Sequence, residues 1–94
     1  MQLSVTATSS VPPDQVAAIE RRLEATAHAA GDRLRRLHVT LRSEGEAGAP
    51  TFVADALAFL EDRIVPAHAT GRTPSEAGEA LAGELVRRLS QSGG

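Results

Sequence analysis

The chain has 94 residues, with 10 basic and 12 acidic side chains and a formal net charge of −2. This length predicts a single domain with a modest core, and the acidic balance is unfavourable for a protein whose affinity rests on neutralising nucleic-acid phosphates. The absence of cysteine excludes disulfides and thiolate metal sites and favours a cytoplasmic protein. No apolar run approaches the ~20 residues that span a bilayer, so we expect no membrane partner.

Every basic residue is arginine, and lysine is absent. Arginine binds phosphate through two parallel hydrogen bonds, a geometry that lysine cannot reproduce. The arginine bias therefore fits a phosphate-contacting protein, and it equally fits a genomic preference for arginine and alanine codons.

Two different periodicities predict the first two elements. Apolar and polar residues alternate over residues 2–8, which is typical of a half-buried strand. Over residues 13–30, apolar side chains recur at the spacing of one helix face. Gly31 follows at the position where a helix commonly ends. The apolar members of the helix are Val16, Ile19, Leu23 and Ala27.

A second alternating segment, residues 35–43, predicts another strand. One of its sides carries Arg36, His38 and Arg42, a basic stripe. Such a stripe suits a phosphate-contacting face, and it also suits a solvated outer sheet face covered by arginine stems. Residues 43–50 are rich in Gly, Glu and Ala and predict a loop.

The pattern of residues 51–60 is ambiguous. The segment has high helix propensity, and both of its alternate sets of side chains are largely apolar. As a strand it would pair with residues 63–70 through a turn at residues 61–63. Pro66 cannot donate to a ladder, so residues 63–70 are predicted to form an edge strand.

The final helix, predicted over residues 74–90, has the clearest signals. Thr73 and Glu76 form a capping box, with Pro74 at the first helical position. An apolar stripe follows, and residues 90–94 are predicted to fray. The stripe consists of Ala77, Leu81, Leu85 and Leu89.

No residue set predicts catalysis, a metal site or a cofactor. The histidines, His28, His38 and His68, are scattered and lack the spacing of metal ligands. Glu61 and Asp62 are adjacent carboxylates, but a polar hairpin turn explains them equally well. We therefore expect a protein that is not an enzyme.

Several segments together resemble the ribosome hibernation promoting factor family, which includes the ribosome-associated inhibitor A and the protein once called sigma-54 modulation protein. The segments are MQLSVT (1–6), IVPAHATG (64–71) and EAGEAL (76–81) with the Leu85, Arg87, Arg88 and Leu89 that follow. The resemblance implies one α+β domain over residues 1–94, ordered β-α-β-β-β-α. It also implies a four-stranded sheet with both helices on one face, which makes residues 51–60 a strand.

The resemblance further implies a stress-response factor that inhibits translation by binding ribosomal RNA of the small subunit. Family members contact this RNA through basic residues on both helices. Arg22 and Arg87 fall on such positions, and Arg88 adjoins the second, whereas Glu84 replaces a basic residue and would repel phosphate. With the strand stripe, the predicted RNA-binding set is Arg22, Arg36, Arg42, Arg87 and Arg88. The alternative is a protein-interaction module with the same fold that has lost RNA binding.

The family pattern also predicts which side chains the helices cover. It places Ala56, Ala58 and Leu60 under the helices and leaves an apolar patch on the opposite, open side. Such a patch predicts a homodimer or a protein partner. The patch comprises Val53, Leu57, Phe59, Ile64 and Pro66. In the alternative register, Leu57 and Phe59 lie in the core and the alanines outside.

Overall fold

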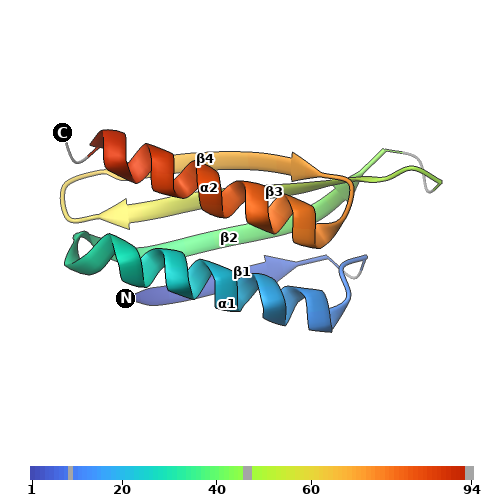
Figure 1. Cartoon of the computed structure of the whole chain (residues 1–94), viewed down its shortest axis with the longest axis horizontal. Helices are drawn as coiled ribbons and strands as arrows, with labels where there is room; N and C mark the ends of the chain where they lie inside the picture. Colours follow the sequence, from blue (N-terminus) through green and yellow to red (C-terminus); the bar gives the residue numbers. More distant parts are fainter. Residues whose placement is uncertain (9, 46–47, 93–94) are drawn as a thin grey trace.

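A computed structural model describes residues 1–8, 10–45 and 48–92, and it confirms the α+β class and the predicted order of elements (Figure 1). Residues 51–60 form a strand despite their helix propensity. In chain order the elements are β1 (Gln2–Ala7), α1 (Pro13–Ala30), the 3-10 turn η1 (Gly31–Arg33), β2 (Leu34–Glu44), β3 (Thr51–Leu60), β4 (Ile64–Gly71) and α2 (Pro74–Ser92).

The strands form one four-stranded sheet in the order β1-β2-β3-β4. β1 and β2 are parallel neighbours, as predicted, and the other two pairs are antiparallel. Ala56 marks the middle of the sheet, because it pairs with Val39 on one side and Ala67 on the other. β4 is an edge strand, which agrees with the position of Pro66.

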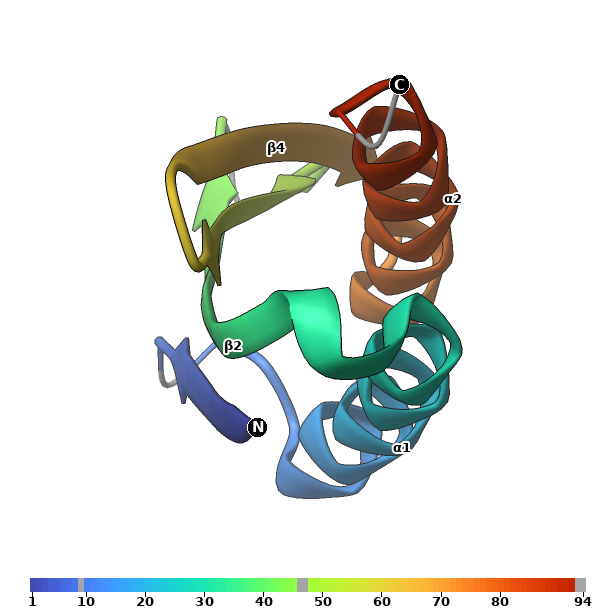
Figure 2. The ribbon, with the colours of Figure 1, turned by 90° about the vertical axis from the view of Figure 1, so that its left-hand side faces the viewer.

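α1 and α2 both cover the same face of the sheet, so the other face is open (Figure 2). Ala54, Ala56 and Ala58 of β3 point into the covered face and are at most 4% exposed, whereas Leu57 is 41% exposed. The predicted register is therefore confirmed, and the alternative register with Leu57 in the core is wrong. Larger side chains from α1, α2 and β2 complete the core, chiefly Leu23, Leu37, Val39, Leu81 and Leu85.

Small residues let the helices approach each other and the sheet. A Cβ added at Gly78 of α2 would lie 2.7 Å from Cγ1 of Ile19 in α1, so only glycine fits this crossing without a shift. At the connection from β4 to α2, a Cβ on Gly71 would lie 2.5 Å from the backbone nitrogen of Ala77. The fold thus depends on backbone contacts that a side chain would block.

The helix ends follow local capping chemistry. The Glu76 backbone N–H donates to Oγ1 of Thr73 at 3.0 Å, which confirms the N-terminal cap predicted for α2. Gly31 ends α1 with a φ of 73°, a conformation in the region that favours glycine. α2 continues to Ser92, two residues beyond its predicted end at residue 90, and residues 93–94 of the predicted frayed tail lie outside the described residues.

Candidate functional site

The five arginines predicted to bind RNA do not form one surface. Arg22 lies on α1, and Arg87 and Arg88 lie on α2. Arg36 and Arg42 lie on the polar side of β2, which faces away from the helices. We call α1 and α2 the helix layer and the uncovered side of the sheet the open face. The two groups therefore lie on different layers, although Arg88 also lines a cavity together with His38, Asp55 and His68.

Carboxylates of the helix layer neutralise its three predicted RNA-binding arginines. Arg22 Nε lies 3.6 Å from Glu79 Oε1 and so links α1 to α2. Glu84 accepts hydrogen bonds from two arginines at once, from Arg88 Nε at 2.7 Å and from Arg87 Nη2 at 2.5 Å. These bonds, Arg88 first and then Arg87, hold the pKa of the Glu84 carboxyl below its usual value although desolvation raises it. A phosphate must compete with these carboxylates to reach the arginines.

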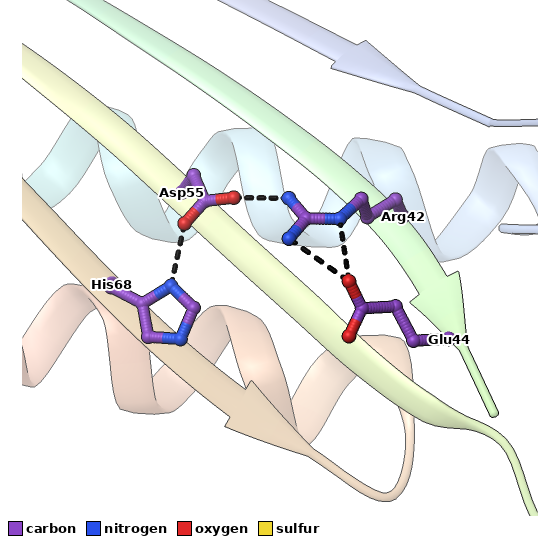
Figure 3. A network of polar contacts seen from close by, with 4 residues as sticks. All are labelled: Arg42, Glu44, Asp55 and His68. Carbon is purple, nitrogen blue, oxygen red and sulfur yellow. Dashed lines mark hydrogen bonds and ion pairs between the residues drawn. The ribbon is translucent and has the colours of Figure 1, made fainter.

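The open face carries a polar network that crosses three strands (Figure 3). Asp55 in β3 lies at its centre and contacts Arg42 of β2 on one side and His68 of β4 on the other. His68 Nδ1 is 2.5 Å from Asp55 Oδ1, and because an ionised carboxylate only accepts, the ring nitrogen donates. Arg42 also donates from Nε to Glu44 Oε1 at 3.2 Å. The network places two carboxylates around one guanidinium.

These contacts shift the protonation equilibria of the network. The hydrogen bond from His68, followed by that from Arg42, holds the pKa of Asp55 below its usual value, against the opposing effect of burial. The hydrogen bonds to Asp55 and Glu44 raise the pKa of Arg42. Asp55 is therefore ionised at neutral pH, and the charge of Arg42 is already balanced within the chain.

Arg36 is the one member of the predicted RNA-binding set whose charge meets a ring instead of a carboxylate in the described part of the chain. Its guanidinium carbon lies 4.2 Å from the ring centroid of Phe59 in β3. This is cation–π geometry, and the arginine stem also shields the ring from water. The stacked pair forms one border of the apolar part of the open face.

The apolar patch predicted on the open face is present, with one correction. Ile64 is 55% exposed and Leu57 is 41% exposed, Pro66 is exposed, and Phe59 is half-buried. Val53 shares this face but is only 3% exposed, so it adds almost nothing to the patch. From here on, the apolar patch means Leu57, Phe59, Ile64 and Pro66. Cross-strand pairing holds it together, because Phe59 pairs with Ile64 and Leu57 pairs with Pro66.

The described residues include no group of three His, Cys, Asp or Glu side chains that could hold a metal ion. Glu61 lies 3.3 Å from Arg35, and Asp62 lies 3.9 Å from Arg63, as expected for charged residues near a polar turn. A shallow cavity of about 440 Å³ lies beside the network and is lined by His38, Asp55, Leu57, Pro66 and His68, among others. Within the described ranges, no helix is long and apolar enough to cross a bilayer.

The network around Asp55 is the feature that the sequence interpretation missed. His68 and Arg42 each fit a solvated strand side on their own, and nothing in their spacing links them. The signal was Asp55 itself, the only charged residue in the apolar stretch TFVADALAFL. A lone carboxylate in such a strand needs polar partners from its neighbours, and the strand pairing supplies them.

The fold is similar to that of a ribosomal subunit interface protein from Coxiella burnetii. The two structures align with a TM-score of 0.75 and 18% sequence identity, over 99% of this chain and 98% of the other. At this identity the likeness shows the fold. No family model matches the sequence, and no curated protein matches it significantly.

Proposed function

We propose that the chain associates with the ribosome and inhibits translation by occupying ribosomal RNA of the small subunit, without chemistry. The observation that carries the proposal is the whole-length likeness of its fold to a ribosomal subunit interface protein. The resemblance of segments 1–6, 64–71 and 76–81 to the hibernation factor family supports it independently of the fold.

Contact through the helix layer agrees best with the placement of the arginines. The resemblance assigns RNA contacts to both helices, and Arg22, Arg87 and Arg88 lie there. Each helix carries three carboxylates and two arginines, so the layer has no net positive field to attract RNA. Binding then requires phosphates to replace Glu79 and Glu84 as the acceptors of these guanidinium groups. The expected result is modest affinity that falls steeply with salt.

Co-sedimentation with purified small ribosomal subunits, at about 50 mM and 200 mM salt, tests this mechanism. Arg87→Ala and Arg88→Ala should weaken binding and lower the salt slope by about one unit each. Arg35→Ala is the matched control, because Arg35 pairs with Glu61 away from the helix layer and should have no effect. Arg36→Ala and Arg42→Ala report on the open face in the same assay. Binding that ignores both salt and every arginine would exclude the proposal.

The open face favours a second function, association with another protein. Ile64 and Leu57 are large apolar side chains exposed on the same face and close to each other through the Phe59–Ile64 and Leu57–Pro66 pairs. Contiguous exposed apolar surface marks interaction sites in proteins of this size. The open face lies opposite the helix layer (Figure 2), so association there does not compete with RNA contact by the helices.

A further inference from the structure

We propose that the protein partner of the open face is a second copy of this chain, placed so that β3 of each copy packs over β4 of the other. The inference rests on the second of the two functions proposed above. It follows from the register of the β3–β4 hairpin and from the charges that this register brings together.

The pairing of β3 with β4 determines which residues a twofold axis would bring into contact. Phe59, Leu57 and Asp55 of β3 stand directly opposite Ile64, Pro66 and His68 of β4. A twofold axis that runs parallel to the strands, in front of the groove between β3 and β4, exchanges the two strands without shifting along them. Each residue then meets the partner copy's equivalent of its own cross-strand neighbour.

The resulting contacts are complementary in every row. Phe59 meets Ile64 of the other copy, and Leu57 meets Pro66, so apolar surface covers apolar surface. In the next row Asp55 meets His68 of the other copy, which adds a third donor to a carboxylate that already accepts from Arg42 and from its own His68. Each copy supplies the same patch, as an isologous interface requires. No like charges face each other.

Other twofold arrangements bring like charges together. An axis perpendicular to the strands and level with Asp55 would place the two Asp55 carboxylates against each other. Shifting that axis to centre the apolar patch would set Asp55 against Glu61 of the other copy, two residues beyond Phe59 along the chain. Like charges opposed across an interface cost affinity and suppress that arrangement. Charge complementarity therefore selects the axis parallel to the strands.

The size of the surface predicts a weak dimer. A standard interface covers about 800 Å² of each partner, roughly one-seventh of the 5569 Å² surface of this chain. The open face over β3 and β4, two strands about 4.8 Å apart, offers less contact area than that to a second sheet packed about 10 Å away. The association should therefore depend on concentration, with monomer and dimer in exchange.

Sedimentation velocity across a concentration series tests the proposal on the intact chain. The wild type should shift from monomer to dimer, and Ile64→Asp should raise the dissociation constant by at least about tenfold through a buried, unpaired charge. Val86→Asp is the matched control: Val86 is 53% exposed on the helix layer and Ile64 is 55% exposed on the open face. Circular dichroism should show both variants folded. Equal effects of the two substitutions, or a wild type that remains monomeric, would overturn the inference.

Cross-linking tests the orientation, because the chain has no cysteine of its own. A mixture of Leu57→Cys and Pro66→Cys chains should be joined efficiently by a short bismaleimide reagent. Ser4→Cys is the control, because in the proposed dimer the two β1 strands lie about 24 Å apart laterally. Efficient Ser4→Cys self-linking would instead indicate an axis perpendicular to the strands and overturn the proposed geometry.

Photo-cross-linking in living cells, from a photo-reactive residue introduced at position 57, distinguishes failure of this inference from failure of the function on which it rests. An adduct with the mass of two chains supports self-association. An adduct of a different mass overturns self-association but leaves protein association through the open face in place. The absence of any adduct overturns both.

Discussion

The two faces of the sheet do not differ as hydrophobicity alone would predict, because the covered face of β3 carries the smaller apolar side chains. On β3 the covered face presents Ala54, Ala56 and Ala58, all nearly inaccessible, whereas the open face presents the larger Leu57 and Phe59. The reason is space: small side chains on the strand let the helices approach, and leucines from the helices and β2 then fill the core at native density. Burial in this fold therefore follows helix clearance, and the larger apolar residues of β3 lie on the open face.

The largest expected difference is between replacing a leucine in the core and replacing a leucine on the open face. Leu81 is 0% exposed in the core. Leu81→Ala therefore leaves a cavity there and should lower the free energy of unfolding by about 2–5 kcal/mol. Leu57→Ala, on the open face, should lower it by less than about 1 kcal/mol. Urea denaturation of the dilute protein measures both. If Leu57→Ala were as damaging as Leu81→Ala, Leu57 would belong to the core and the comparison of faces would fail.

The second effect depends on helix clearance itself. Gly78→Ala places a methyl group 2.7 Å from Cγ1 of the buried Ile19 and should cost about 1–3 kcal/mol of stability through overpacking. Gly83→Ala, on the same helix, meets nothing within 4 Å and should add about 0.5–1 kcal/mol, because alanine is the better helix former. The midpoint temperature of thermal denaturation should fall for Gly78→Ala and rise for Gly83→Ala.

A double-mutant cycle sharpens the Gly78 prediction. Ile19→Ala alone loses apolar packing, but it also removes the atoms that the new methyl group would strike. The combination of Gly78→Ala with Ile19→Ala should therefore cost less than the sum of the two single changes. Strictly additive costs would show that the destabilisation does not arise at this helix crossing.

The sequence predicted most of the fold, and the reasons for its successes and failures are local. Alternation over residues 2–8 and the cap at Thr73 each predicted an element because one physical pattern dominated there. Residues 51–60 offered no such pattern, since both sides of the strand are apolar; only the family resemblance made the segment a strand. The end of α2 was predicted too early, because Ser90 reads as a tail residue although the helix continues to Ser92.

The candidate sites were less predictable, because they depend on partners that lie far apart in the chain. Arg22 was recognised as basic, but its pairing with Glu79 joins two helices and follows no sequence spacing. Asp55 lies 13 residues from both Arg42 and His68, and only the pairing of three strands brings them together. The register taken from the family pattern placed Val53 in the exposed patch, yet it is 3% exposed on the open face.

A third prediction, with an expected effect of intermediate size, concerns the charge balance of the helix layer. Glu84→Gln removes the carboxylate that holds Arg87 and Arg88, so both guanidinium groups become available to phosphate. Binding to small ribosomal subunits at low salt should tighten several-fold, and the salt slope should steepen by up to about two units. Glu61→Gln, which frees Arg35 outside the helix layer, is the control. Unchanged affinity for Glu84→Gln would show that the helix layer does not face the RNA.

The smallest expected effect is the pH dependence of the open-face network. The pKa of Asp55 is lowered in the folded chain, chiefly by His68 and then by Arg42, so the folded state binds this proton less readily than the unfolded state. The stabilisation is complete above the unfolded aspartate pKa of about 3.9 and disappears as the pH falls through the lower folded value. Because the Asp55 side chain is 40% exposed, solvent screening limits the contribution to about 1 kcal/mol or less.

Asp55→Asn isolates this contribution, because asparagine keeps the shape of the side chain and lacks the titrating carboxyl group. The difference in unfolding free energy between wild type and variant, measured in urea, should be full at pH 7, begin to shrink near pH 4 and vanish at more acidic pH. Arg42, whose pKa is raised by its hydrogen bonds to Asp55 and Glu44, stays cationic throughout the acidic range and does not reverse the sign. A difference that grew on acidification would mean that the network raises the pKa of Asp55, and the open face would then carry an electrostatic cost where we infer a stabilising one.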